Sequence, residues 1–150
     1  MSVTFGNGAS PAAEFVRNRV ADCARKLQES AALGIEGVIR GELADVWEEC
    51  SQPDWDGYSA LPVEWDSYYL TERLLRGLPL GTPKPSVGAE PDGQLTLEWA
   101  RSRRRRLSVS VSPDGDLHYA ALLGPERTCG TAPFVDEVPR TILSLIRQVS

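Results

Sequence analysis

The stretch PKPSVGAEPDGQLTLEWARSRRRRLSVSVSPDGDLHYAALL, residues 83–123, decides the fold of this chain of 150 residues. Apolar residues recur at every second position in LTLEW (95–99), LSVSV (107–111) and, with one slip, LHYAALL (117–123). A period of two places one apolar face on each β-strand, because successive side chains of a strand point to opposite sides of the sheet. The stretch therefore predicts consecutive strands that bury one common face.

Turn sequences separate these runs. Two Pro-Asp-Gly triplets, at residues 91–93 and 113–115, each offer a proline with a fixed φ, an aspartate acceptor and a glycine that accepts positive φ. The register of the predicted hairpins places Val109 inside the protein and Ser110 outside. We therefore expect a four-stranded antiparallel β-meander, with strands at about residues 86–90, 94–100, 105–112 and 116–123.

Apolar residues at helical spacing fill the part of the chain before the strands. Ser10 followed by Pro11 is typical of a helix start, and the pattern continues in two successive runs. We predict that residues 10–52 form a helical hairpin beside the sheet and supply a protein contact, and that residues 1–9 are disordered. The sheet domain would then cover residues 53–150.

Two further helices are predicted within the sheet domain. One spans about residues 63–76 with Trp65 on its buried side, and the other begins near Asp136, which is expected to cap it. Residues 124–134, GPERTCGTAPF, are typical of a loop. Helices that flank a run of strands favour an α+β fold, in which the helices cover one face of an antiparallel sheet. The predicted core is apolar throughout: Leu74, Leu95, Leu97, Trp99, Leu107, Val109, Val111, Leu117, Tyr119, Ile142, Leu145 and Ile146.

The composition is that of an ordinary globular protein, with 41% hydrophobic and 25% charged residues. A net charge of −5 disfavours a general binder of nucleic acids or anionic membranes. The three cysteines are widely spaced without a Cys-x-x-Cys motif, and there is one histidine, which disfavours a metal site. The sequence shows no apolar run of about 20 residues and no signal peptide. We therefore expect a cytoplasmic protein without metal, cofactor or membrane partner.

Four segments together resemble a family of small uncharacterised bacterial proteins. They are PDWDGYSALPV (53–63), LPLGTPKPSVGAEPDGQLTLEW (78–99), LSVSVSPDGDLHYAALLG (107–124) and VPRTILSLIRQV (138–149). The resemblance covers about residues 53–149 and implies no particular activity, fold or ligand. It therefore assigns a role to no residue.

One cluster of positive charge lies at the predicted tip between the second and third strands. Its five guanidinium groups could bind phosphates or an acidic partner in bidentate fashion, as in a nucleic-acid-binding protein or a small nuclease. The alternative is a solvated turn whose arginines pair with acidic residues of the same chain. The cluster comprises Arg101, Arg103, Arg104, Arg105 and Arg106.

The polar face of the sheet offers a second candidate. The predicted register places Ser110 near His118, with Glu98 a diagonal step away, which is the composition of a hydrolase triad. A triad requires a nucleophile that is hydrogen-bonded to its base, usually at a strained turn, and a flat strand does not supply that strain. A solvated polar face is the commoner arrangement in antiparallel sheets.

The leading prediction is a non-catalytic protein-interaction module, such as the antitoxin, immunity or accessory protein of a mobile or defence locus. The loop DWDGY (54–58) supplies Trp55, Asp56 and Tyr58 as candidate contacts, and the second helix supplies Leu43 and Trp47. Aromatic residues of this kind dominate many protein interfaces, although the same loop could plug a core instead. The partner would be a second copy of the chain or a different protein.

Overall fold

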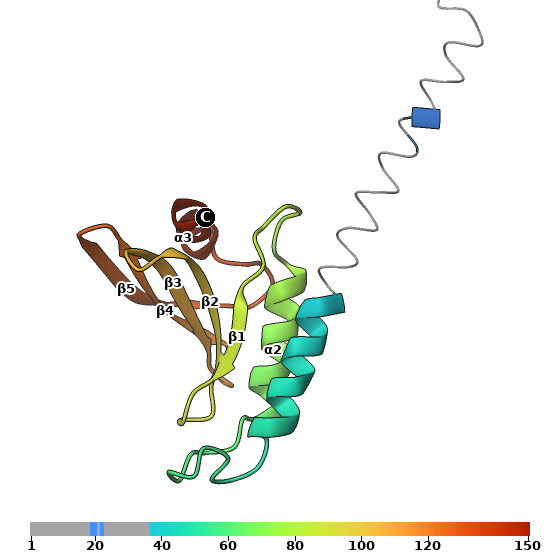
Figure 1. Cartoon of the computed structure of the whole chain (residues 1–150), viewed down its shortest axis with the longest axis vertical. Helices are drawn as coiled ribbons and strands as arrows, with labels where there is room; N and C mark the ends of the chain where they lie inside the picture. The colour runs from blue at the N-terminus through green and yellow to red at the C-terminus, as the bar shows by residue number, and fades with distance from the viewer. Residues whose placement is uncertain (1–18, 21, 23–36) are drawn as a thin grey trace, which may run out of the picture. The chain divides into compact units, whose positions relative to one another are not determined.

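The computed structural model describes residues 19, 20, 22 and 37–150. By their contacts, the residues divide into two compact units, Met1–Gly34 and Ile35–Ser150, and the following account concerns the second unit (Figure 1). Two predictions, disorder in residues 1–9 and the first helix of the N-terminal hairpin, fall outside the described residues.

A five-stranded antiparallel sheet forms the centre of this unit. Its strands lie side by side in chain order, and each one is hydrogen-bonded to the next. They are β1 (Ser86–Ala89), β2 (Leu95–Ser102), β3 (Arg105–Val111), β4 (Asp116–Leu123) and β5 (Glu126–Pro133). The α+β class is therefore confirmed, whereas the predicted count of four strands is wrong.

β5 occupies residues that the sequence assigned to a loop. Their composition, ERTCGTAP, lacks apolar alternation, so that the strand depends on its partner β4. Gly124, with a φ of 68°, permits the tight turn before β5. Tyr119 is paired with Gly130, and its ring lies so close that a Cβ atom at position 130 would be 2.5 Å from the tyrosine hydroxyl oxygen. The aromatic ring of β4 thus covers the glycine of β5 and completes the strand pair.

The apolar face of the sheet is the one that the alternation predicted. Val109 is fully buried, while Ser110 on the opposite face is partly exposed. Helices α2 (Trp65–Arg76) and α3 (Arg140–Val149) pack against the apolar face (Figure 1). α3 begins after Pro139, three residues later than a cap at Asp136 would place it. All predicted core residues are buried except Tyr119, which is half-buried.

The buried side of α2 differs from the prediction. Ser67, Thr71 and Leu74 face the interior, whereas Trp65 is 60% exposed. The Thr71 hydroxyl donates a hydrogen bond of 2.7 Å to the Ser67 carbonyl oxygen, which satisfies a hydroxyl that would otherwise be buried without a partner. Small side chains on this side let the helix approach the sheet closely, and the bulky aromatic side faces away from the sheet.

Residues 37–50 are helical and belong to the sheet unit. Leu43 and Cys50 share a core with Val63 and Leu95 of β2, and an ion pair joins Glu42 to Lys84 before β1. The predicted separation of a hairpin over residues 10–52 from the sheet domain is therefore wrong for this helix. Its apolar stripe is buried in the same unit as the sheet.

Candidate functional site

Three aromatic side chains stack on one another at the junction of helix 37–50 and α2. The Trp47 ring meets the Trp65 ring edge-on with centroids 5.4 Å apart, and it lies 5.3 Å from the Tyr68 ring. Trp65 and Tyr68 are stacked at 5.1 Å, with an interplanar angle of 20°. Aromatic pairs at these separations contribute about 0.5–1.5 kcal/mol each beyond the area that they bury. The stack therefore holds the two helices together and fixes the orientation of each ring.

Part of this stack remains open to solvent. Trp65 is 60% exposed, and Tyr69, one residue after Tyr68, is 51% exposed. Trp65 and Tyr69 are four residues apart on α2, so that they share one side of the helix. We call Trp47, Trp65, Tyr68 and Tyr69 the aromatic patch.

Arg73 continues the patch along α2. Its guanidinium group lies 5.9 Å from the centroid of the Tyr69 ring and 5.4 Å from that of Phe134, distances at which a cation is attracted to an aromatic face. The same group donates a hydrogen bond of 2.9 Å to the Val135 carbonyl oxygen. Tyr69 is thereby supported from the side that faces away from Trp65.

The predicted acidic loop is folded by its own side chains. The Asp56 carboxylate accepts hydrogen bonds from the backbone N–H groups of Tyr58 (2.8 Å) and Ala60 (3.1 Å). Asp54 likewise accepts a bond of 2.6 Å from the N–H of Ser59. Both aspartates thus satisfy loop amides, which is a structural role typical of Asx turns.

The other predicted contact residues differ in accessibility. Tyr58 is 89% exposed, and Trp55 is half-buried with its indole N–H bonded to the Leu61 carbonyl oxygen at 2.9 Å. Leu43 is fully buried and is not available to a partner, because it packs against the sheet. Trp47 is half-buried within the aromatic patch.

Two of the five arginines at the β2–β3 tip bond to the end of α3. Arg101 donates to the Ser150 carbonyl oxygen at 3.1 Å, and Arg105 donates to that of Gln148 at 3.0 Å. The last carbonyl groups of a helix lack partners within the helix and carry partial negative charge, so that arginines there stabilise the helix end.

The remaining three arginines point elsewhere. Arg106 forms an ion pair of 3.5 Å with Glu98. The side chains of Arg103 and Arg104 make no hydrogen bond or ion pair with any described residue, so only these two are free to meet a phosphate.

The predicted triad residues are neighbours without the bonds that a triad requires. Ser110 is paired with His118 across β3 and β4, but its hydroxyl donates to the Glu90 carboxylate at 2.6 Å. His118 instead shares a hydrogen bond of 3.0 Å with the Thr131 hydroxyl. Glu98, the predicted acid, is held by Arg106. The described geometry therefore does not activate Ser110 as a nucleophile.

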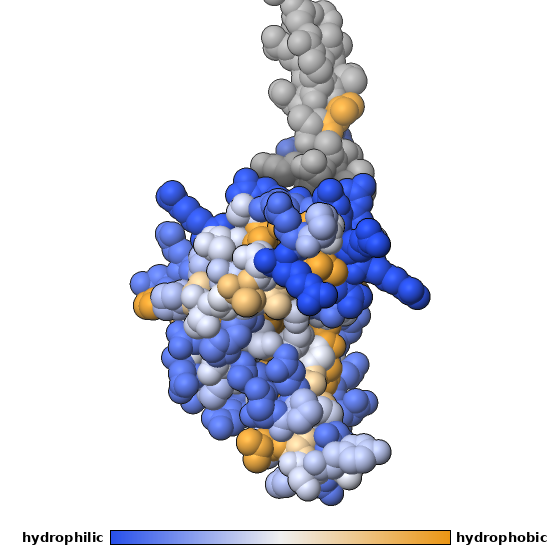
Figure 2. Space-filling model, turned by 90° about the vertical axis from the view of Figure 1, so that its left-hand side faces the viewer, coloured by the Kyte–Doolittle hydropathy of each residue, from blue (hydrophilic) through white to orange (hydrophobic). Residues whose placement is uncertain are grey.

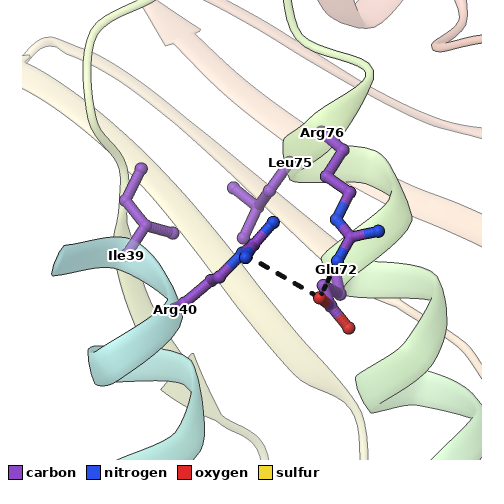
Figure 3. A pocket seen from close by; sticks show the side chains of 5 residues that line it. All are labelled: Ile39, Arg40, Glu72, Leu75 and Arg76. Atoms are coloured by element: carbon purple, nitrogen blue, oxygen red, sulfur yellow. Dashed lines mark hydrogen bonds and ion pairs between the residues drawn. The ribbon is translucent and has the colours of Figure 1, made fainter. Parts of the chain in front are cut away.

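The hollow between helix 37–50 and α2 is small. It has a volume of about 30 Å³, far below the roughly 300–1,000 Å³ of a typical ligand pocket. Glu72 lies beside it, 2.6 Å from the Arg76 guanidinium and 4.0 Å from that of Arg40 (Figure 3). Two arginines thus converge on one carboxylate, in a space too small for a substrate.

Two wider grooves lie on the surface. One, of about 430 Å³, crosses the polar face of the sheet between Glu98 and Cys129, and the other, of about 490 Å³, runs between residues 79–83 and α3. No cluster of three His, Cys, Asp or Glu side chains suited to a metal ion occurs within the described residues. Among the described helices, none has the length and apolar composition that a bilayer crossing requires.

Comparisons of the chain with protein-family models, with curated proteins and with solved structures found no match. A functional assignment therefore depends on the geometry of this chain itself. Sequence reasoning missed Trp65 and Tyr69 as surface residues, because it expected Trp65 to be buried. One signal could have indicated that the two aromatic residues lie at the surface. They are four residues apart, in line with Arg73 and the polar end of α2.

Proposed function

We propose that this chain is a non-catalytic protein-binding module and that the aromatic patch binds its partner, a different protein. One observation carries the proposal. The Trp65 side chain is 60% exposed, although two aromatic neighbours already hold its orientation. Tryptophan and tyrosine are the residues most enriched among interface hot spots, because each buries a large area and retains a polar group.

Preorganisation favours binding at this surface. A side chain that is already fixed loses little conformational entropy when a partner covers it. Trp65 is held by stacking, and Tyr69 by the guanidinium group of Arg73. Binding at the patch therefore costs less conformational entropy than binding through flexible side chains.

The border of the patch indicates the chemistry of the partner. Glu72 follows Tyr68 by one helical turn, and Arg40 and Arg76 lie on either side of its carboxylate (Figure 3). A polar border of both signs around an apolar centre is the usual anatomy of a protein–protein interface. The partner surface would present an apolar recess for Trp65, with paired charges at its edge.

The test is quantitative recovery of a partner from nuclease-treated lysate of the source cells. The full chain is compared with the double variant Trp65→Ala and Tyr69→Ala, and Leu80→Ala serves as the matched control, because Leu80 is an exposed apolar residue outside the patch. A protein recovered with the native chain and the control, but at least about tenfold less with the double variant, supports the proposal. Equal recovery with the double variant, or recovery of no protein, refutes it.

A further inference from the structure

β5 is an exposed edge of the sheet. It lies at the edge of the sheet (Figure 1). Among the described elements β5 pairs only with β4, so its outward backbone groups have no strand partner. α3 packs over β2, β3 and β4, and most residues of β5 are exposed. An uncovered edge strand is a template for pairing with another strand. β1, the opposite edge, has only four residues.

One turn hydrogen bond determines which groups of β5 point outward. Phe134 N–H donates to the Gly115 carbonyl oxygen at 2.9 Å, which continues the β4–β5 ladder beyond its last pair. Bonded and non-bonded pairs alternate in an antiparallel ladder, so that the even-numbered residues of β5 bond to β4. The odd-numbered residues Arg127, Cys129 and Thr131 therefore direct their N–H and C=O groups away from the sheet.

The two prolines of this hairpin lie symmetrically about Cys129. Pro125 precedes Cys129 by four residues, and Pro133 follows it by four. Neither proline has an N–H group to donate. In an antiparallel pair of two β5 strands centred on Cys129, each Pro125 lies opposite the Pro133 of the second copy. All outward groups between the prolines then find partners. A shift of the register by two residues instead places Arg127 opposite Pro133 or Thr131 opposite Pro125, depending on its direction.

Charge is also complementary in this arrangement. The bond from Gly124 N–H to the Arg104 carbonyl oxygen, 2.7 Å long, places the arginine tip beside the β4–β5 turn, near Arg127. At the opposite end of the sheet, the charged residues in or next to the turns are acidic: Asp92, Asp114, Asp116, Asp136 and Glu137. The Arg73 guanidinium also reaches this end, where it is bonded to the Val135 carbonyl oxygen, so the acidic residues still outnumber it. Antiparallel pairing sets the basic end of each copy beside the acidic end of the other, which favours association.

From these observations we infer that two copies of this chain pair through β5, antiparallel and centred on Cys129, and join their sheets into one. Figure 2 looks onto the β5 side of the molecule, where hydrophilic colouring predominates, so that backbone bonds and charge are the main contacts. An edge contact of this kind is smaller than a standard interface, and we expect a dissociation constant on the order of micromolar. The site is separate from the aromatic patch.

The first test measures the mass of the full chain in solution by analytical ultracentrifugation over a concentration series. Thr131→Pro removes an outward N–H group that does not bond to β4, and Thr131→Ala is the matched control, which keeps that group. The native chain and Thr131→Ala should dimerise alike, and Thr131→Pro should raise the dissociation constant at least about tenfold. A native chain that stays monomeric at about 500 μM, or a folded Thr131→Pro protein that dimerises normally, overturns the inference.

The second test locates the register. Opposed residues of a bonded antiparallel pair have Cα atoms about 5.5 Å apart, within reach of a disulfide. In a Cys23→Ala background, a copper–phenanthroline oxidant that accepts the two electrons should link two Cys129 thiols and release their protons. The control combines Cys129→Ala with Thr131→Cys, which separates the thiols by four residues. Equal yields from both proteins overturn the register. Trp65→Ala should leave the dimer unchanged, so that failure here is distinguishable from failure of the proposed function.

Discussion

Replacing Gly130 by alanine tests whether the Tyr119 ring specifies β5. The added Cβ atom would lie 2.5 Å from the tyrosine hydroxyl oxygen and 2.8 Å from the ring carbon that carries it. Ordinary carbon contacts are about 3.5–4.0 Å, so the ring must move by about 1 Å or leave its place over β5. Inserting a methyl group into such a contact costs about 1–3 kcal/mol.

A smaller gain opposes this cost. Alanine restricts the unfolded chain more than glycine does, which is worth about 0.5–1 kcal/mol in an element interior. The net expectation is a loss of about 1–2 kcal/mol in the free energy of unfolding, or a melting temperature lower by about 2–8 °C for a domain of this size. Gly88→Ala is the matched control, because a Cβ atom there meets nothing within 4 Å.

Thermal and urea unfolding of the two variants would measure the difference. Gly88→Ala should equal or exceed the native stability. In a Tyr119→Val background, Gly130→Ala should lose most of its cost, which gives a coupling energy of about 1 kcal/mol or more between the two positions. Equal stability of Gly130→Ala and Gly88→Ala, or the absence of coupling to Tyr119, would refute the explanation of why these residues form a strand.

Three further predictions follow from burial, hydrogen bonding and titration. Val109→Asp should abolish the cooperative melt of the domain, because it buries a carboxylate without a partner, whereas Ser108→Asp on the polar face should keep the fold, as circular dichroism would show. Arg105→Gln should lower the unfolding free energy by about 1 kcal/mol through loss of its bond to the end of α3, while Arg103→Gln should change it by less than about 0.5 kcal/mol in urea titrations. Burial, aided by the negative charge of a neighbouring glutamate, raises the pKa of the Cys50 thiol above its ordinary value of 9.0. The folded state therefore holds that proton more tightly. This contribution to the free energy of unfolding is complete below pH 9.0 and is lost as the pH rises further. Urea titrations of Cys50→Ala should therefore lack this part of the fall in unfolding free energy at high pH.

The central strands could be predicted from local sequence. Alternation between Leu107 and Val111 and the two Pro-Asp-Gly turns determine which side of each strand is buried, because a shift of one residue would move every apolar side chain into water. The stripe of α3 that ends at Val149 is equally local, since its apolar residues recur at the helical period. The pattern that predicts each of these elements lies within about ten consecutive residues.

The candidate sites depend on contacts between distant residues. Ser110 bonds to Glu90 rather than to His118, because β2 folds back along β1 and Glu90, which directly follows β1, brings its carboxylate to the polar face. Arg101 finds its acceptor at the last residue of the chain. No local pattern encodes such partners, since each requires two segments far apart in the sequence to have already packed.

For the same reason, the two proposed binding surfaces could not be predicted from the sequence. Trp65 is exposed only because the small side of α2, with Ser67 and Thr71, fits the sheet more closely than its aromatic side. β5 is a strand only because β4 offers hydrogen bonds and a tyrosine ring above Gly130. The sequence by itself determined which residues form the core of the sheet, and tertiary packing decided which strand and which aromatic residues remain at its surface, because burial of the best-fitting side excludes the alternatives.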